Sequence, residues 1–165
     1  MKKASVWFLC FALVMSVAVS GCAKKGSGSG ASSLKSEDIP LDEANISFSE
    51  PAGIPLLEED IHYDYNKSNI RADAKPILEG VASWMNQNPN KYIMIEGHCD
   101  DRGSKEYNLA LGEQRALSAR RYLVDLGIEA KRVHTISYGE ESPIDTGSNE
   151  AAYEKNRRGH FLISR

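Results

Sequence analysis

Apolar residues occupy every second position from Ile61 to Tyr65, and this alternation predicts a half-buried strand. From about Asp73 to Asn86 the apolar residues recur at helical spacing instead. Pro76 fits this helix because it falls in the first turn, where the missing N–H costs little. The run Asn88-Pro89-Asn90 predicts where the helix ends.

The rest of the chain repeats this change of period. A second strand is expected from Lys91 to Gly97 and a long helix from about Lys105 to Leu126, with Gly127 as its C-cap. A helical turn at 130–132, a strand at 133–138, a short helix at 149–156 and a last strand at 159–164 follow. Strands separated by helices imply some parallel pairing. The predicted fold class is α+β (mixed α/β), a single mixed β-sheet of about four strands with two main helices packed on one face.

The long helix has two distinct faces. One is a seam of small and apolar residues that would let the helix lie close to the sheet, namely Gly112, Ala116, Ala119, Leu123 and Leu126. Beside this seam, Asn108, Leu111 and Arg115 follow the i, i+3, i+7 spacing that stacks side chains on one face. We expect the seam to pack and the neighbouring face to be free to bind.

The polar loop before the long helix carries Asp100, which a strand-to-helix turn can present at the edge of the sheet. Asp100 and Arg115 would then place an anion and a cation on one cleft, an arrangement that suits the zwitterionic head of an amino acid. Arginine grips a carboxylate through two parallel hydrogen bonds, which lysine cannot do. A surface salt bridge between the two residues explains the spacing equally well.

The N-terminal part of the chain reads as a targeting segment. Residues 1–21 have a positive start and an apolar run too short to span a membrane, which predicts a signal peptide that is removed. The run ends in Val-Ser-Gly before Cys22 and resembles the bacterial lipobox, which implies lipidation of Cys22. The alternative is an ordinary cleavage site with an incidental cysteine. Residues 22–58 are expected to form the lipidated N-terminus and a flexible tether, and residues 59–165 the folded domain.

Composition narrows the function without deciding it. The 165 residues carry a net charge of −3 with 26% charged residues, so no basic excess suggests nucleic acid. Of the three cysteines, Cys10 leaves with the signal peptide and Cys22 is expected to be lipidated. Cys99 then has no partner for an intramolecular disulfide. The fold must therefore depend on its core.

The run His98-Cys99-Asp100 invites a catalytic reading, because a cysteine nucleophile needs a base and an orienting acid. Neighbours along a strand point to opposite faces, however, so His98 and Cys99 cannot easily share a hydrogen bond. A metal site that adds His134 lacks closely spaced ligand pairs. The residues therefore predict no enzyme and no metal centre.

Several motifs occur in order between Glu96 and Arg120. They are Gly-His-x-Asp, a later Gly, Tyr-Asn-x-x-Leu and x-x-Arg-Ala, formed here by Gly97, His98, Asp100, Gly103, Tyr107, Asn108, Leu111, Arg115 and Ala116. Further on, Tyr138-Gly139-Glu140 and Asn156-Arg157-Arg158 continue the pattern. The combination resembles the signature of the OmpA-like peptidoglycan-binding domain family and covers about Ile61 to Ile163. With the lipobox, the chain is most similar to the Pal-type lipoproteins of that family.

This resemblance implies that the domain binds peptidoglycan non-covalently, without a cofactor and without catalysis. It implies recognition of the diaminopimelate residue in the peptide stem, with Asp100 holding its ammonium group and Arg115 its carboxylate. Asn108 and Leu111 would line the same cleft. The alternatives are a cell-wall hydrolase and an OmpA-like interaction module outside the Tol-Pal system.

The resemblance also implies a location and partners. Ala23, rather than Asp, follows Cys22, which points to a lipid anchor in the outer membrane with the domain facing the periplasm. A Tol-Pal-type envelope system would make TolB a partner.

Four further positions are marked by the family pattern. Arg102 matches a position that contacts the peptide stem, and its alternative is an exposed loop charge. Tyr65 and Asn66 match a block that in many members is Phe-Asp-Lys, and Asn66 departs from it by removing a negative charge. One of the two arginines at 157–158 is expected to shape the binding face, and the sequence does not choose between them.

Overall fold

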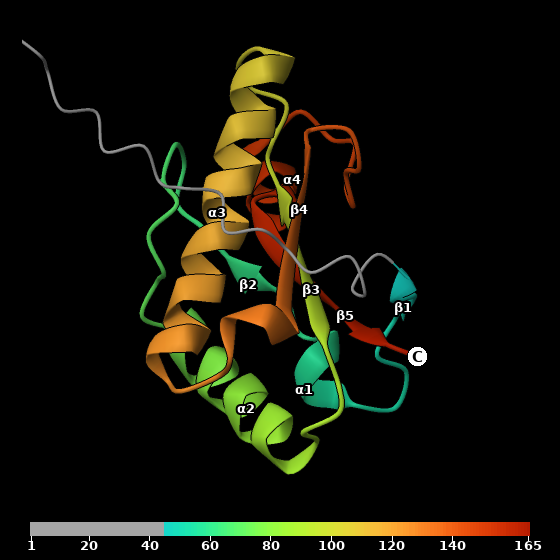
Figure 1. Ribbon diagram of the computed structural model, residues 1–165. Helices are drawn as coiled ribbons and strands as arrows, with labels where there is room; N and C mark the ends of the chain where they lie inside the picture. The colour runs from blue at the N-terminus through green and yellow to red at the C-terminus, as the bar shows by residue number, and fades with distance from the viewer. Residues whose placement is uncertain (1–44) are drawn as a thin grey trace, which may run out of the picture. The chain divides into compact units, whose positions relative to one another are not determined.

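A computed structural model describes residues 45–165, which form a mixed sheet with helices (Figure 1). The sheet order is β1-β5-β3-β4, formed by Phe48–Ser49, Arg158–Ser164, Ile93–His98 and Val133–Gly139. β3 pairs parallel with β4 and antiparallel with β5. The short β2, Ile61–His62, pairs antiparallel with the start of β5, and β1 pairs with its end. The expected signal peptide, Cys22 and the first part of the expected tether lie outside the described residues.

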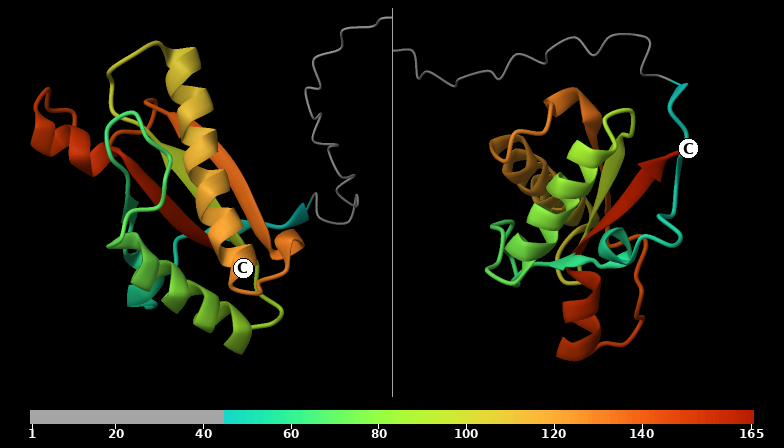
Figure 2. Two further views of the ribbon diagram at one scale, coloured as in Figure 1. Left: turned by 90° about the vertical axis from the view of Figure 1, so that its left-hand side faces the viewer. Right: turned by 90° about the horizontal axis from the view of Figure 1, so that it is seen from below.

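The two long helices, α2 (Ala74–Gln87) and α3 (Lys105–Asp125), cover one face of the sheet, as Figure 2 shows. On that face Ile93, Ile95 and Phe161 are fully buried and form the core with the helices. The residues between them on β3 and β5 are only partly buried, as alternation along a strand requires. The predicted fold class, a mixed sheet with two main helices on one face, is confirmed.

The limits of α2 follow the sequence signals closely. Asp73 is its N-cap residue, so Pro76 falls in the first turn as expected. Leu78, Val81 and Met85 are fully buried along its inner face. At the other end the N–H of Asn88 donates to the carbonyl of Met85 and closes the helix before Pro89.

The predicted small-residue seam brings α3 against β3. An added Cβ at Gly97 would lie 1.9 Å from the carbonyl oxygen of Gly112, and one at Gly112 would lie 2.3 Å from the hydroxyl of Ser137. Ala116, Ala119 and Leu123 continue this contact and are fully buried. Only glycine permits such a close approach of helix to strand. Leu126 does not join the seam, because it lies at the helix C-cap and is 40% exposed.

Two differences from the sequence prediction concern the start of the domain. β2 contains only two residues, because beyond it the N–H of Arg157 bonds to the carbonyl of Tyr153 and not to Tyr63, and a turn follows at Asp64–Lys67. Residues before 59 also belong to the fold. Phe48–Ser49 pairs with β5, and the short helix α1 (Pro55–Glu58) places Leu57 in the core with no exposure. The described part of the expected tether, residues 45–58, therefore lies against the domain, because long-range pairing recruits this stretch.

The smaller predicted elements are present. A 3-10 turn, η2, spans Ala130–Arg132, and α4 spans Glu150–Asn156 with Asn149 as its cap. None of the helices within residues 45–165 has the length and apolarity needed to cross a membrane.

Candidate functional site

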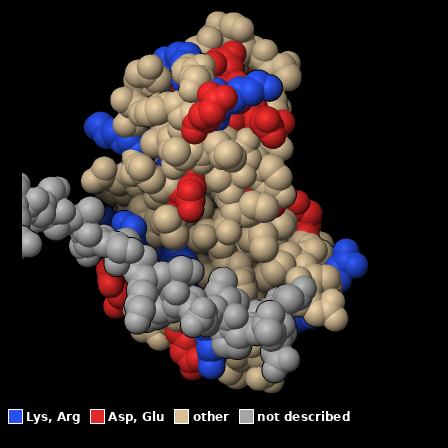
Figure 3. All heavy atoms as spheres, turned by 45° about the horizontal axis from the view of Figure 1, so that its top comes forward, with Lys and Arg blue, Asp and Glu red and all other residues tan. Residues whose placement is uncertain are grey.

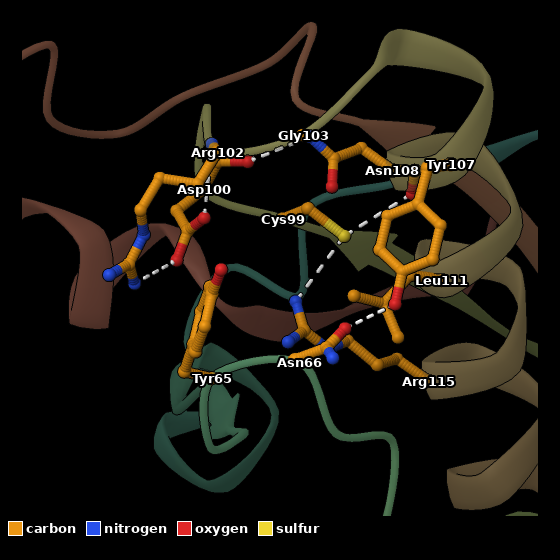
Figure 4. Close-up of a pocket in the computed structure, with 10 residues that line it drawn as sticks. All are labelled: Tyr65, Asn66, Cys99, Asp100, Arg102, Gly103, Tyr107, Asn108, Leu111 and Arg115. Carbon is orange, nitrogen blue, oxygen red and sulfur yellow. Dashed lines mark hydrogen bonds and ion pairs between the residues drawn. The ribbon is translucent and has the colours of Figure 1, made fainter.

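The motif residues surround a pocket where β3 ends and α3 begins. The pairing of β3 with β4 is irregular between Gly97 and His98, and the chain then turns through the loop at 99–103. Ser104 caps α3 by accepting a hydrogen bond from the N–H of Tyr107. The pocket has a volume of about 180 Å³ (Figure 4). Its lining residues are Tyr65, Asn66, Cys99, Asp100, Arg102, Gly103, Tyr107, Asn108, Leu111 and Arg115.

All seven ligand-contact candidates from the sequence line this pocket. Cys99, Gly103 and Tyr107 line it too, although the sequence argument did not assign them a binding role. Gly103 and Tyr107 are part of the family motif, and this motif is the sequence signal that could have assigned them to the pocket. For Cys99 the sequence argument weighed a nucleophile, a metal ligand and a disulfide partner, and none of these roles assigned it to a binding pocket.

Asp100 is buried and held by two arginines. Its Oδ2 accepts from Nη2 of Arg102 at 2.7 Å and from Nη1 of Arg157 at 3.1 Å, and its Oδ1 accepts from the backbone N–H of Arg102 at 3.2 Å. Burial alone would raise the pKa of Asp100, but these hydrogen bonds outweigh it and leave the pKa below its ordinary value. The carboxylate is therefore ionised at neutral pH.

Arg115 is 1% exposed, and backbone carbonyls hold its guanidinium. Nε donates to Lys67 at 2.9 Å, Nη2 to Asp64 at 3.1 Å and Nη1 to His98 at 2.8 Å. Nη1 also lies 3.3 Å from the sulfur of Cys99. The face of α3 that was expected to be free is therefore largely engaged, and Arg115 fastens the 64–67 turn to the helix.

Asn108 is fixed by its amide nitrogen. Nδ2 donates to the carbonyl of Asp100 at 3.2 Å and to Oε2 of Glu140 at 2.5 Å. Both donors are thus used, so only the amide oxygen is left to accept a hydrogen bond. Glu140, from the loop after β4, positions this amide without lining the pocket itself.

Aromatic rings frame the pocket opening. The guanidinium of Arg102 lies between Tyr65 and Tyr153, 4.0 Å and 4.4 Å from the ring centroids. The hydroxyl of Tyr107 donates to Oδ1 of Asn66, which has a left-handed backbone with φ of 55°. These contacts hold the 64–67 turn beside α3 and α4.

The structure distinguishes the two consecutive arginines that the sequence left open. Arg157 points toward the pocket side and pairs with Asp100. Arg158 points to the other face of the sheet, where its Nε lies 3.3 Å from Oδ2 of Asp60. Arg157 is therefore the one that shapes the pocket.

His98 and Cys99 lie on opposite sides, as strand alternation predicts. The ring of His98 stacks on Tyr138 with centroids 5.6 Å apart, on the face away from the helices. Cys99 is buried and its thiol donates to the carbonyl of Asn108 at 3.2 Å. Burial raises the pKa of this thiol to about 11, so it stays protonated at neutral pH. No nucleophile and base are paired here among the residues that the structure describes.

Acidic and basic side chains are interspersed at the end of the molecule that carries the start of α3, as Figure 3 shows. Neither sign of charge forms a continuous patch on the face that this figure shows.

Comparisons with known proteins agree with this arrangement. The sequence profile of the OmpA family matches residues 62–157. The peptidoglycan-associated lipoprotein of Rhizobium meliloti is 39% identical over 160 residues, which covers 92% of this chain and 85% of that protein. The crystal structure of the peptidoglycan-associated lipoprotein from Burkholderia pseudomallei matches with a TM-score of 0.64 and 33% identity, covering 66% of this chain and 92% of that one. The C-terminal domain of Helicobacter pylori MotB, at 20% identity and a TM-score of 0.61, covers 65% of this chain and 84% of its own; it shows the fold alone.

Proposed function

Because the chain belongs to the OmpA family and matches peptidoglycan-associated lipoproteins over most of its length, we propose that it is a lipoprotein that binds peptidoglycan. The observation that carries this proposal is that the family motif surrounds one pocket in which carboxylate, guanidinium and amide groups converge. The protein would link a membrane to the wall by holding it, with no bond made or broken.

The ligand within the wall is proposed to be the diaminopimelate residue of the peptide stem. Its free end is an amino-acid head that carries an ammonium and a carboxylate group, and Asp100, Arg102 and Arg115 supply both opposite charges. The pocket volume of about 180 Å³ is below the roughly 300–1,000 Å³ typical of sites that enclose a drug-sized ligand. Such a space suits one end of a side chain better than a sugar.

The proposed role is non-catalytic. The buried thiol of Cys99 stays protonated, and the ring of His98 lies on the opposite face of the sheet. A hydrolase using these residues is the alternative. Incubation of the purified protein with sacculi separates the two, since release of soluble muropeptides would contradict the binding-only role.

The anchor and the Tol partnership rest on the sequence resemblance. Lipidation at Cys22 would hold the protein in the outer membrane with the domain in the periplasm, and TolB would be a second partner. The variant Cys22→Ser should carry no acyl chain, and mass spectrometry of the membrane fraction checks this. A pull-down of TolB with and without peptidoglycan fragments checks whether the two partners compete.

Co-sedimentation with purified sacculi tests the central proposal. The chain carrying Cys22→Ser, which removes the anchor, should pellet with sacculi and be released by free diaminopimelate. Adding Asp100→Asn should weaken binding by about 10- to 150-fold, because a charged hydrogen bond contributes about 1.5–3 kcal/mol.

The matched control is Asp101→Asn, a neighbouring exposed carboxylate that does not line the pocket. It should bind as the parent does. Equal binding by both variants and the parent would overturn the assignment of Asp100, and failure of the parent to pellet would overturn the function.

A further inference from the structure

Asp100 has little capacity left for a ligand. Both of its oxygens already accept hydrogen bonds from Arg102 or Arg157, and its side chain is only 5% exposed. Three of the roughly four acceptor positions of this carboxylate are taken, so a ligand ammonium group that binds it with more than one hydrogen bond must take the place of a guanidinium.

The two arginines differ in how firmly they are held. Arg157 has a side chain that is 6% exposed, and its Nε donates to the buried carbonyl of Tyr63 at 3.1 Å. Arg102 is 32% exposed and lies beside Asp100 in the pocket (Figure 4). Its second partner, Glu150, is 64% exposed and 3.3 Å away. Arg102 is thus the more exposed of the two guanidinium groups and the one that can leave Asp100 more readily.

Arg115 cannot supply the two-pronged grip that a carboxylate prefers. A guanidinium has five N–H donors, and four of those of Arg115 are used by three carbonyls and the sulfur of Cys99. Binding a carboxylate with two of its donors would release the 64–67 turn. The guanidinium of Arg102 bonds to the side chains of Asp100 and Glu150 and stacks on Tyr65 and Tyr153. Turning it toward a ligand therefore breaks no hydrogen bond to the backbone of the 64–67 turn.

We propose that Arg102 is the specificity-determining residue of this pocket and works by exchanging partners. The ligand ammonium replaces Arg102 on Asp100, and the released Arg102 pairs with the ligand carboxylate. A zwitterionic head replaces the one ion pair between Arg102 and Asp100 with two, whereas an amine alone or a carboxylate alone replaces it with only one. The inference rests on the proposed function, because the zwitterion is taken to be the free end of a peptide stem.

Titration calorimetry tests the exchange on the chain carrying Cys22→Ser, with and without Arg102→Met. The probes are meso-diaminopimelate, cadaverine, which lacks carboxylates, and pimelate, which lacks amines. The parent should prefer diaminopimelate over either partial analogue by at least about 100-fold. In Arg102→Met the affinity for diaminopimelate should fall about 10-fold and the affinity for cadaverine should rise about 10-fold. The preference for diaminopimelate over cadaverine should then nearly disappear.

The matched control is Arg71→Met, because Arg71 is 29% exposed and pairs at 2.7 Å with Asp73 outside the pocket. It should leave all three affinities unchanged. The exchange is overturned if Arg102→Met lowers the affinity for all three probes equally or changes none of the three affinities. It is also overturned if the parent protein does not prefer diaminopimelate. Co-sedimentation of the same parent protein with sacculi separates the two failures. If the parent still pellets with sacculi, the exchange is wrong but the proposed function stands.

Discussion

Arg157 and Arg158 are neighbours in the chain, yet they belong to two different polar clusters. Arg157 reaches the helix-covered face and pairs with Asp100, while its Nε donates to a carbonyl of the 61–65 stretch. Arg158 reaches the opposite face and lies 3.3 Å from Asp60, and its Nε and Nη1 make no hydrogen bond to another part of the protein. On that same face, neither ring nitrogen of the buried His98 makes a hydrogen bond.

The two faces of the sheet therefore carry polar clusters with different properties. On the pocket side, bonds from several elements hold each buried charge in one position, which prepares the pocket before a ligand arrives. On the opposite face several buried nitrogen atoms of His98 and Arg158 make no hydrogen bond, and two histidines there have pKa values shifted in opposite directions. We therefore expect binding to depend on the first cluster and the pH dependence of stability on the second.

The largest effect should come from closing the space between α3 and β3. Gly97→Ala places a methyl group against the backbone of Gly112, which cannot yield as a side chain can. We expect a loss of about 3 kcal/mol or more in the free energy of unfolding, measured in urea. Met94→Leu, on the opposite face of the same strand, conserves volume and should cost less than about 1.5 kcal/mol. Similar losses in the two variants would mean that β3 is packed no more tightly against α3 than on its opposite face.

Replacing each arginine by methionine compares the two clusters directly. Arg157→Met removes a buried partner of Asp100 and should cost about 3 kcal/mol in unfolding free energy. Arg158→Met removes one hydrogen bond to Ser142, at 3.3 Å, and the ion pair with Asp60, which stays paired with His160, so it should cost about 1 kcal/mol. Sacculus binding should fall only for Arg157→Met. An equal loss of binding in both variants would mean that the clusters are not separate.

The two histidines should give stability opposite slopes with pH. His160 lies 2.6 Å from Asp60 and 3.0 Å from Glu50, pairs in register with Glu96, and its hydrogen bond with Asp60 raises its pKa. Its stabilising effect is therefore fully present below the unfolded pKa of about 6.5 and is lost as pH rises through the higher folded value. In His160→Gln, the deficit in unfolding free energy should be largest at acidic pH and shrink toward pH 9.

His98 should show the reverse. Burial lowers its pKa although Glu96 lies 3.5 Å away, and the charge of Arg158 lowers it further. The fold favours the neutral ring, so stability is lost as pH falls below about 6.5. In His98→Gln, the deficit should shrink on acidification. If the unfolding free energies of the two histidine variants changed with pH in the same direction, relative to the parent, the opposite pKa shifts would be refuted.

The smallest effect is expected at Glu50, whose side chain is 72% exposed. An exposed ion pair contributes little, so Glu50→Gln should change the unfolding free energy by less than about 0.5 kcal/mol. Asp60→Asn, which removes the half-buried partner of both His160 and Arg158, should cost more. If Glu50→Gln costs as much as Asp60→Asn, the first residues of the domain are held more firmly than their exposure suggests.

Periodicity and terminal signals determined the helices, the later strands and the fold class. Ser104 caps α3 through the N–H of Tyr107, and Gly127 follows the end of α3 with a positive φ of 96°, so local sequence is enough to place the ends of this helix. The motif also identified residues that line one pocket. The sequence did not reveal that Phe48–Ser49 pairs with β5, because a two-residue strand has no measurable period of its own.

What the tertiary structure alone decided was the partner of each charge. Asp100 bonds to Arg157 across 57 positions, and Arg115 bonds to the carbonyls of Asp64 and Lys67 across 51 and 48. Spacing along one helix cannot specify such pairs, because they depend on where a distant strand and turn come to lie. The sequence alone therefore determined which polar groups meet at the end of β3, and long-range packing determined which of them remain free to meet a ligand.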